Sequence, residues 1–257
     1  MGKFNLKLFI KRKILRNKET SDDVLKRLRK GGADIGEDVL IYSTSKTMID
    51  GSSPYLLKIG NHVRIAEGVK ILTHDYSWSV LKRWSSDEIS PGVILGAQSP
   101  VEIGNCVFIG MNAVITRGVT IGDHVVIGTG SIVTKDCPSN GVYAGNPAKR
   151  IMSIEEYRRK REALQFDEAK DIAIRYRRRM GKNPPIEVFS EYFPLFCTAD
   201  AAREVPVFLK QMGRMGNLED TVRYMQTHPP RFPGYAAFLE ACYGDGEAET
   251  GSGENGK

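Results

Sequence analysis

Cysteine is scarce in this sequence, with four residues among 257, and no two of them form a Cys-x-x-Cys pair. The four are Cys106, Cys137, Cys197 and Cys242. Their wide separation argues against both a disulfide framework and a zinc site built from cysteines. Because this usage is typical of a reducing compartment, we expect a cytoplasmic protein.

Long apolar runs are also missing, and none approaches the roughly 20 residues that a transmembrane helix needs. At the N-terminus, lysines interrupt every apolar run of MGKFNLKLFIKRKILRNK, which excludes the apolar region of a signal peptide. This stretch opens a predicted basic helical segment over residues 1–33. Two placements stay open for it: packing on the protein itself, or peripheral association with the inner membrane surface.

The charge balance is basic, with 37 Lys and Arg against 31 Asp and Glu and a net charge of +6. Such a balance favours anionic ligands such as phosphates, nucleic acid or acidic lipids, and it does not choose among them. A solvated basic surface explains it equally well. Hydrophobic residues make up 41% of the chain, which is enough for a sizeable core.

The sequence does contain an internal period of six residues. The large aliphatic positions are Ile103, Ile109, Ile115, Ile121, Ile127 and Val133. Small or β-branched residues stand four positions after the first five of these, namely Val107, Ala113, Val119, Val125 and Ser131. A period of six matches neither a helix nor an alternating strand. It predicts short strands joined by tight corners, in coils that stack around one apolar column.

The same spacing extends upstream and then slips. Its earlier aliphatic members are Ile35, Ile41, Ile59, Ile65 and Ile71, with Thr47 and Ser53 as weak members between them. From Ile71 to Ile103 the separation is 103 − 71 = 32 residues, which is five hexads plus two. A segment must leave the column there, and the polar stretch 76–92, which holds both tryptophans, is the predicted protruding loop. Loops of this length in a compact repeat are usually functional.

Helical signals flank the repeat. Residues 21–32 are predicted to form a short capped helix, and SIEE at residues 153–156 has the spacing of a capping box that starts a helix running to about Met180. Further helices are expected around 200–212 and 218–226, so residues 153–243 form a predicted helical extension. Residues 244–257 are polar and Gly-rich and are predicted to be a disordered tail.

The repeat followed by GSIVTKD and AGNPAKRI resembles the hexapeptide-repeat acyltransferases. Within them it is most similar to maltose and galactoside O-acetyltransferases and to the O-acetyltransferases of surface polysaccharides. The resemblance implies a mainly β fold, a left-handed parallel β-helix over residues 34–152. It further implies a homotrimer with each active site between two subunits, acetyl-CoA as a cosubstrate rather than a permanently bound cofactor, a carbohydrate acceptor, and no nucleic acid.

His74 is the candidate catalytic residue. Transfer of an acetyl group to a hydroxyl needs a base, and histidine suits that role near neutral pH. By resemblance, the base stands at the end of a coil beside the protruding loop, and only His74 is so placed. It would take the proton of the attacking hydroxyl and return it to the leaving sulfur.

Four residues near His74 are candidates for binding the acceptor. Asp75 either orients the imidazole, contacts the acceptor, or bonds nearby backbone amides as a turn aspartate. Tyr76 and Trp78 either stack on a sugar ring or fix the loop against the neighbouring subunit. Asp50 is expected near the acceptor.

The resemblance also implies a coenzyme site. Phe108 would lie against the acetyl-CoA arm, and the backbone at Met111 would meet the thioester. The positions that line the pantetheine and adenine groove are Thr129, Thr134 and Lys135. Lys149 and Arg150 would bind the phosphates. Met152 stands where the sugar acetyltransferases often have a second arginine, and their oxyanion asparagine has no clear counterpart, so we expect an acceptor other than maltose or a galactoside.

Two other functions stay open. A trimeric β-helix carbonic anhydrase would need three histidines around zinc, which His62, His74 and His124 would have to supply. Against it, His62 and His124 fall at hexad positions that point outward at corners, and the GNPAKR ending favours coenzyme A over a metal. The second alternative is a non-enzymatic trimeric scaffold, which would not bind acetyl-CoA.

Overall fold

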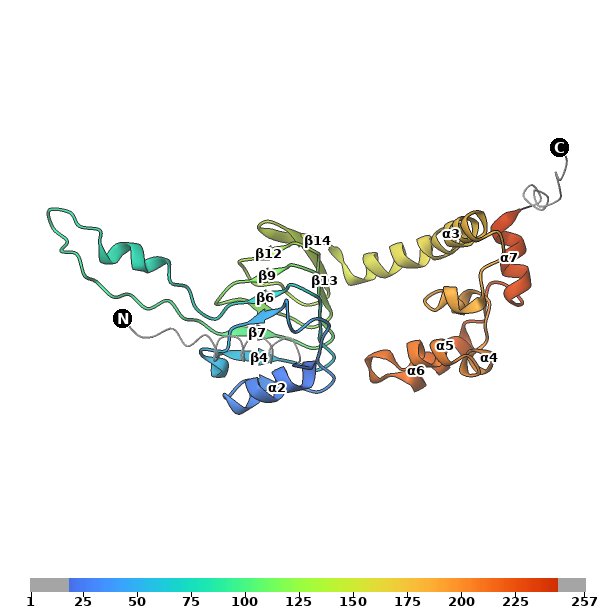
Figure 1. Cartoon of the computed structure of the whole chain (residues 1–257), viewed down its shortest axis with the longest axis horizontal. Helices are drawn as coiled ribbons and strands as arrows, with labels where there is room; N and C mark the ends of the chain where they lie inside the picture. The colour runs from blue at the N-terminus through green and yellow to red at the C-terminus, as the bar shows by residue number, and fades with distance from the viewer. Residues whose placement is uncertain (1–18, 245–257) are drawn as a thin grey trace, which may run out of the picture. The chain divides into compact units, whose positions relative to one another are not determined.

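The computed structural model describes residues 19–244 (Figure 1). The chain divides into two compact units, the first ending at Tyr157 and the second beginning at Arg158. The N-terminal part of the predicted basic helical segment, residues 1–18, and the predicted tail from residue 245 onward lie outside the described residues.

The first unit is a column of three sheets (Figure 1). Their paired strands are parallel except at one end of the largest sheet, where the last pair is antiparallel. Sheet A consists of β1 (Asp34–Ile35), β4 (Leu57–Ile59), β7 (Val101–Ile103) and β10 (Thr120–Ile121). Sheet B consists of β2 (Leu40–Ile41), β5 (Arg64–Ile65), β8 (Phe108–Ile109), β11 (Val125–Ile127), β13 (Gly141–Gly145) and β14 (Ala148–Ser153). Sheet C consists of β3 (Met48–Ile49), β6 (Lys70–Ile71), β9 (Val114–Ile115) and β12 (Ile132–Val133). Up to β12, every third strand returns to the same sheet, which confirms the predicted stack of coils.

The inward positions of the column are those that the period of six predicts. Strand pairing stacks Ile65 on Ile109 and Ile71 on Ile115, and all four side chains are fully buried. At the corners, neighbouring coils approach closely. A Cβ atom at Gly110 would lie 2.6 Å from the backbone nitrogen of Thr129 in the next coil, so only glycine fits there.

We expect Ile109→Ala to lower the free energy of unfolding by about 2 to 5 kcal/mol, because it leaves a cavity in a side-chain stack that is fully buried. Ile94, which is 70% exposed, is the matched control, and Ile94→Ala should change stability by less than about 0.5 kcal/mol. Denaturant unfolding of the two variants measures the difference. Equal effects would contradict the inward placement of Ile109.

The first coil departs from the predicted register. Ile49, and not Thr47, pairs with Ile71 in sheet C, so the period of six misplaces the aliphatic position of this coil by two residues, although Thr47 and Ser53 are both buried. The corner between sheets B and C is longer in this coil, where the Thr47 amide bonds the Ser43 carbonyl across a turn (3.0 Å). As a result, Asp50 directly follows strand β3.

The chain leaves the column after β6 and returns at β7, so the excursion covers residues 72–100 and is longer than the predicted 76–92. We call this segment the arm; in Figure 1 it extends away from the column. Its base is closed by an antiparallel bridge between His74 and Gln98, with a hydrogen bond from the Asp75 amide to the Ala97 carbonyl (2.8 Å). A 3-10 helix, η2 (Ser77–Lys82), lies within it.

Helix α2 (Ser21–Lys30) covers the first coil of the column, as predicted for this region. Thr20 caps it, accepting a hydrogen bond from the Asp23 amide (3.2 Å) while the Asp23 carboxylate accepts one from the Thr20 amide. Leu25 and Leu28 of this helix are buried in the same core as the column isoleucines. A short 3-10 helix, η1 (Pro54–Leu56), follows the first coil.

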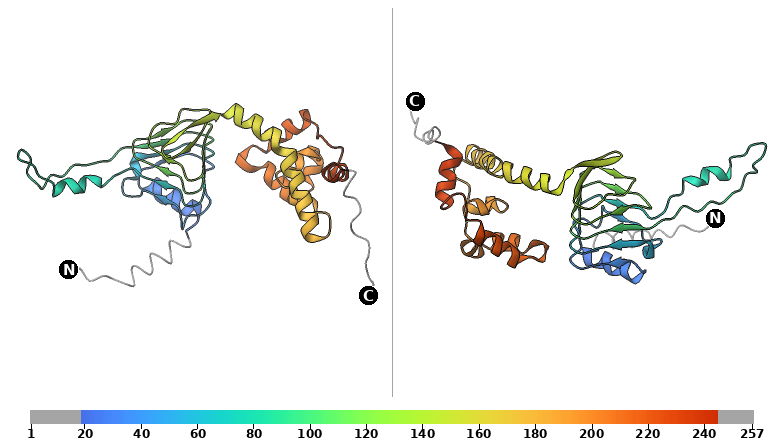
Figure 2. Two further views of the ribbon diagram at one scale, coloured as in Figure 1. Left: turned by 90° about the horizontal axis from the view of Figure 1, so that it is seen from above. Right: turned by 180° about the vertical axis from the view of Figure 1, so that it is seen from behind.

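The second unit is helical and has its own core. Its helices are α3 (Ile154–Met180), whose first turn belongs to the first unit, α4 (Ala199–Arg203), α5 (Pro206–Met212), α6 (Leu218–Thr227) and α7 (Tyr235–Tyr243), with 3-10 helices η3 (Ile186–Phe189), η4 (Phe193–Leu195) and η5 (Arg214–Gly216). The predicted capping box is confirmed, because the Ser153 and Glu156 side chains each bond the other's amide. Phe189, Phe208 and Phe238 are fully buried. Figure 2 shows the helices of this unit from two further directions. Among the described residues, every helix is too short or too polar to span a bilayer.

Candidate active site

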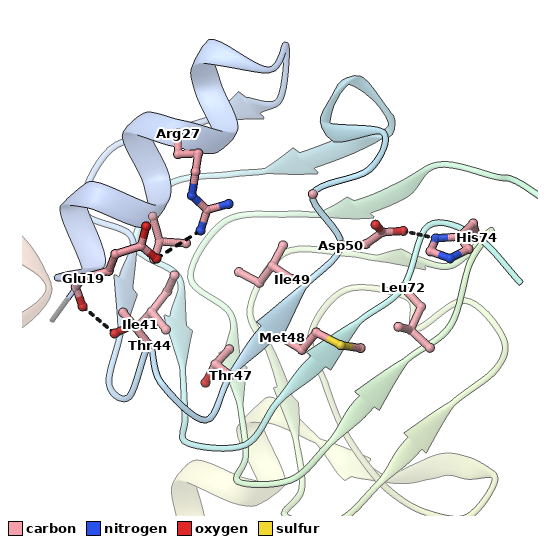
Figure 3. Close-up of a pocket in the computed structure, with 12 residues that line it drawn as sticks. Glu19, Arg27, Ile41, Thr44, Thr47, Met48, Ile49, Asp50, Leu72 and His74 are labelled. Carbon is pink, nitrogen blue, oxygen red and sulfur yellow. Dashed lines mark hydrogen bonds and ion pairs between the residues drawn. The ribbon is translucent and has the colours of Figure 1, made fainter. Parts of the chain in front are cut away.

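The central feature of the site is a pair formed by His74 and Asp50. Asp50 follows β3 and His74 lies three residues after β6, and these two strands are paired in sheet C. The pairing brings the Nδ1 atom of His74 to 2.5 Å from the Oδ2 atom of Asp50 (Figure 3). The Asp50 side chain is only 6% exposed, whereas that of His74 is 45% exposed. A buried carboxylate therefore holds a histidine that solvent and ligands can reach.

Asp50 accepts five hydrogen bonds. Its Oδ1 atom accepts from the amide (2.9 Å) and hydroxyl (2.7 Å) of Ser52. Its Oδ2 atom accepts from the hydroxyl (2.6 Å) and amide (3.3 Å) of Thr73 and from His74. Burial alone would raise the pKa of Asp50, but the hydrogen bonds from Thr73, Ser52 and His74 outweigh it and hold the pKa well below its ordinary value.

The ionised Asp50 fixes the tautomer of His74. A carboxylate accepts hydrogen bonds and has none to donate, so the Nδ1 atom of His74 carries the hydrogen in this contact. The Nε2 atom is then the basic nitrogen. When it takes a proton, the imidazolium is stabilised by the adjacent carboxylate. This arrangement suits general base catalysis.

His74 lines two cavities. The larger, about 610 Å³, lies between α2 and strand β3. Its apolar wall includes Ile41, Met48 and Ile49, and Arg27 and Glu19 face it from the side of α2 (Figure 3). Arg27 and Glu19 form an ion pair at 3.3 Å.

The smaller cavity, about 330 Å³, is lined by Asp75, Thr116 and Arg117 together with Leu72 and His74. Thr116 belongs to the next coil, since the Thr116 corner follows β9, the partner strand of β6. The imidazole thus borders both a cavity reaching towards α2 and one reaching towards the later coils.

A family model described as bacterial transferase hexapeptide (six repeats) matches residues 100–135. Over 155 residues the chain is 44% identical to Protein CapG of Staphylococcus aureus, and this match covers 60% of the chain and 81% of CapG. The chain belongs to the hexapeptide-repeat acyltransferases.

This acyltransferase is also 41% identical over 102 residues to galactoside O-acetyltransferase of Escherichia coli (strain K12), covering 40% of the chain and 46% of that relative. The match thus spans just under half of the relative's length. Among solved structures, a maltose O-acetyltransferase from Clostridium difficile 630 shares 30% identity at a TM-score of 0.38, covering 55% and 81% of the two chains. Galactoside acetyltransferase in complex with coenzyme A shares 31% identity at a TM-score of 0.39, covering 57% and 79%.

The residues predicted on the acceptor side of the acyltransferase take different positions. The Asp50 carboxylate, expected to contact the acceptor, borders the larger cavity and accepts hydrogen bonds from Ser52, Thr73 and His74. Asp75 bonds the amide (2.8 Å) and hydroxyl (3.1 Å) of Ser77, as a turn aspartate does. These bonds, the amide first, lower the pKa of Asp75. On the arm, Tyr76 and Trp78 pack edge to face, with ring centroids 4.9 Å apart.

The predicted coenzyme residues of the acyltransferase are all exposed, and five of them lie at or beside two different edges of the column. At the edge between sheets B and C, the Gly130 amide bonds the Met111 carbonyl (2.7 Å), which places Met111 and Thr129 in neighbouring coils, with Phe108 on the adjoining strand β8. Thr134 and Lys135 follow β12, at the edge between sheets C and A that also carries Asp50 and His74.

The two basic residues predicted to bind phosphate lie on β14. The Arg150 guanidinium donates to the Asn140 carbonyl (3.3 Å), and both Lys149 and Arg150 are exposed. One chain therefore does not bring all the predicted coenzyme residues to one edge.

A second histidine–aspartate pair lies at the edge between sheets A and B. His62 Nδ1 is 2.9 Å from Asp38 Oδ2, and Arg64 shares the same carboxylate at 2.7 Å. His62 and the exposed His124 both lie at corners, as predicted, and both have left-handed backbone angles (φ 57° and 54°). Neither lines the cavities beside His74. Across residues 19–244, no three His, Cys, Asp or Glu side chains come together as a metal site would require.

The residues of the site that were not predicted include Arg27, Thr73 and Arg117. A signal for Arg117 was present, because the period of six stacks Thr116 beside Leu72, two residues from His74. Thr73 bonds Asp50, and Arg27 lines the larger cavity. Neither contact can be predicted without knowing how the irregular first coil pairs with the second.

Proposed function

We propose that this acyltransferase is an acetyl-CoA-dependent O-acetyltransferase that modifies a sugar hydroxyl in surface-polysaccharide or glycoconjugate synthesis, with His74 as the general base. The observation that supports this most strongly is the His74–Asp50 pair, in which a buried carboxylate orients an exposed imidazole bordering two cavities. The relationship to a galactoside O-acetyltransferase supports a sugar acceptor.

In the proposed reaction, the Nε2 atom of His74 removes the proton of the acceptor hydroxyl as its oxygen bonds to the thioester carbonyl carbon. The carbon–sulfur bond then breaks, and the imidazolium returns the proton to the sulfur, giving the acetyl ester and free coenzyme A. Asp50 stabilises the imidazolium between these two transfers. No covalent enzyme intermediate is formed.

The larger cavity is the proposed acceptor site. A volume of about 610 Å³ lies within the range of small-molecule sites. Its apolar wall offers contact to the carbon–hydrogen face of a sugar ring, while Arg27, Glu19 and Thr44 offer hydrogen bonds to hydroxyls. The charges of Arg27 and Glu19 offset each other, which favours an uncharged sugar unit in the larger cavity.

The proposed assembly is a homotrimer of left-handed β-helices with acetyl-CoA between two subunits. It is supported by the division of the predicted coenzyme residues between two edges of one column. A single groove can use both edges only if they meet between two subunits. One subunit would supply the edge with Met111 and Thr129, and the other the edge with His74 and Thr134. Lys149 and Arg150 are the proposed phosphate contacts. Light scattering of the purified protein measures the number of subunits.

Release of free thiol from acetyl-CoA, measured against a panel of nucleotide sugars and oligosaccharides, tests the proposed function. We expect thiol release that depends on the acceptor, together with stabilisation by acetyl-CoA of about 2.7 kcal/mol at a hundredfold excess over its dissociation constant. Absence of stabilisation by acetyl-CoA would favour a scaffold, and stoichiometric zinc in the purified protein would favour a carbonic anhydrase. Either result would contradict the proposal.

A further inference from the structure

The helical unit contains a groove of about 450 Å³ to which the acetyl-transfer chemistry assigns no role. Helix α3 forms one side of it, and the segments around η4 and α6 form the rest. All the residues that line it lie in this unit, from Arg161 to Arg231. A cavity of this volume suits a small ligand or one residue of a longer chain.

Flat aromatic surface is available in this groove. Tyr224 and His228, one helical turn apart on and after α6, stack with centroids 4.0 Å apart and planes inclined by 15°. Tyr224 is nevertheless 46% exposed. Across the groove, the Tyr192 hydroxyl is fixed by a hydrogen bond to Glu168 (3.1 Å). Aromatic rings with polar edges suit ligands that combine an apolar face with hydroxyl groups.

The charged side chains of the groove are balanced. Arg161 forms a bidentate ion pair with Glu168, and Glu162 forms an ion pair with Arg158. In the part of the chain that the structure describes, two further charged lining residues form no ion pair. They are Arg231 and Glu191.

Arg231 is held in place without a carboxylate. Its guanidinium lies 4.4 Å from the centre of the Phe166 ring and 5.3 Å from that of Phe232. Such stacking restrains the planar group while its in-plane N–H donors stay available. The groove therefore offers the N–H donors of Arg231 and the carboxylate acceptor of Glu191, neither in an ion pair, beside an aromatic surface.

We propose that this groove binds a neutral saccharide. The charge of Arg231 is offset by that of Glu191, so the groove has no net attraction for a polyanion, which would require an excess of cations. A sugar ring matches the other features, because its carbon–hydrogen face packs on an aromatic ring and its hydroxyls both donate to a carboxylate and accept from a guanidinium. The binding site is separate from the residues of acetyl transfer and would let the helical unit hold a glycan.

Titration calorimetry of the full chain with neutral trisaccharides tests this: maltotriose, cellotriose and triacetylchitotriose, with a hyaluronan oligosaccharide as the anionic comparison. We expect at least one neutral probe to bind. Tyr224→Ala should weaken that binding about tenfold, through loss of the stacking surface, and Glu191→Gln should weaken it by about threefold. Leu209→Ala, at a 40% exposed position on α5 that does not line the groove, is the control and should bind normally.

Two readouts separate this proposal from the proposed acetyl transfer. His74→Ala should retain saccharide binding, and Tyr224→Ala should retain acetyl transfer to a monosaccharide acceptor; thermal unfolding verifies that each variant is folded. Loss of saccharide binding in His74→Ala would place the ligand in the cavity beside His74 and overturn the groove assignment. Binding of the anionic probe alone, binding of no neutral probe, or unchanged binding by Tyr224→Ala would overturn it as well.

Discussion

Replacing His74 with alanine is expected to lower kcat for acetyl transfer by about 10²- to 10⁴-fold, the range that a positioned general base contributes. Acetyl-CoA binding should persist, because the predicted coenzyme contacts involve other residues. Thiol release measures the turnover, and a thermal shift with acetyl-CoA measures the binding.

His62→Ala is the matched control for this variant, because His62 also pairs through Nδ1 with an aspartate but lines neither cavity beside His74. Its turnover should stay close to that of the unmodified enzyme. Near-normal turnover by His74→Ala, or an equal loss in both variants, would overturn the assignment of the base.

Asp50→Asn is expected to lower kcat by roughly 10- to 10³-fold through loss of the carboxylate that orients the imidazole and stabilises its charged form. Neither orientation of an asparagine amide fits. Oδ1 accepts the Ser52 amide and Oδ2 accepts the Thr73 amide, so the NH₂ group would face a backbone N–H donor in either case. The affinity for acetyl-CoA should be largely unaffected.

The corresponding change at the other pair, Asp38→Asn, controls for the general effect of removing a histidine partner. It should leave turnover unchanged, since Asp38 lies at the edge between sheets A and B. Ser52→Ala is a milder variant that removes one hydrogen bond to Asp50, and we expect a smaller loss of turnover. If Asp50→Asn keeps full turnover while folded, Asp50 has no positioning role.

The lowered pKa of Asp50 also predicts how stability depends on pH. A carboxyl group whose pKa is lower in the folded protein than the unfolded value of about 3.9 stabilises the fold above that value. This contribution is lost as the pH falls from about 4 towards the folded pKa. We therefore expect the stability difference between the unmodified enzyme and Asp50→Asn to be largest above pH 5 and to shrink on acidification in denaturant titrations. A difference that grows on acidification would contradict the lowered pKa.

The column was predictable from the sequence because its pattern is local and repeated. Each inward aliphatic residue holds the same position in its hexad, so the period of six alone identifies the buried residues from Ile103 to Val133. The first coil breaks the rule, and continuing the count through Thr47 and Ser53 assigned the wrong inward residue. That error hid the contact between Asp50 and His74, which depends on the pairing of Ile49 with Ile71.

The helical unit was less predictable because non-local packing determines it. The long helix α3 was predictable from its capping box, whereas α7 was not predicted. Phe238 of α7 packs within one aromatic cluster with Phe189 and Phe196, at centroid distances of 4.9 and 4.7 Å. Residues that interact across such sequence separations leave no periodic signature.

The position of the His74–Asp50 pair in the column has a consequence for heat tolerance. The pair joins the first coil to the second, next to the end covered by α2. In a stack where each layer contacts only its neighbours, the terminal layers open at lower cost than the middle ones. Fraying of that end would separate the carboxylate from the imidazole while the later coils stay intact, so catalysis would fail before the protein as a whole melts.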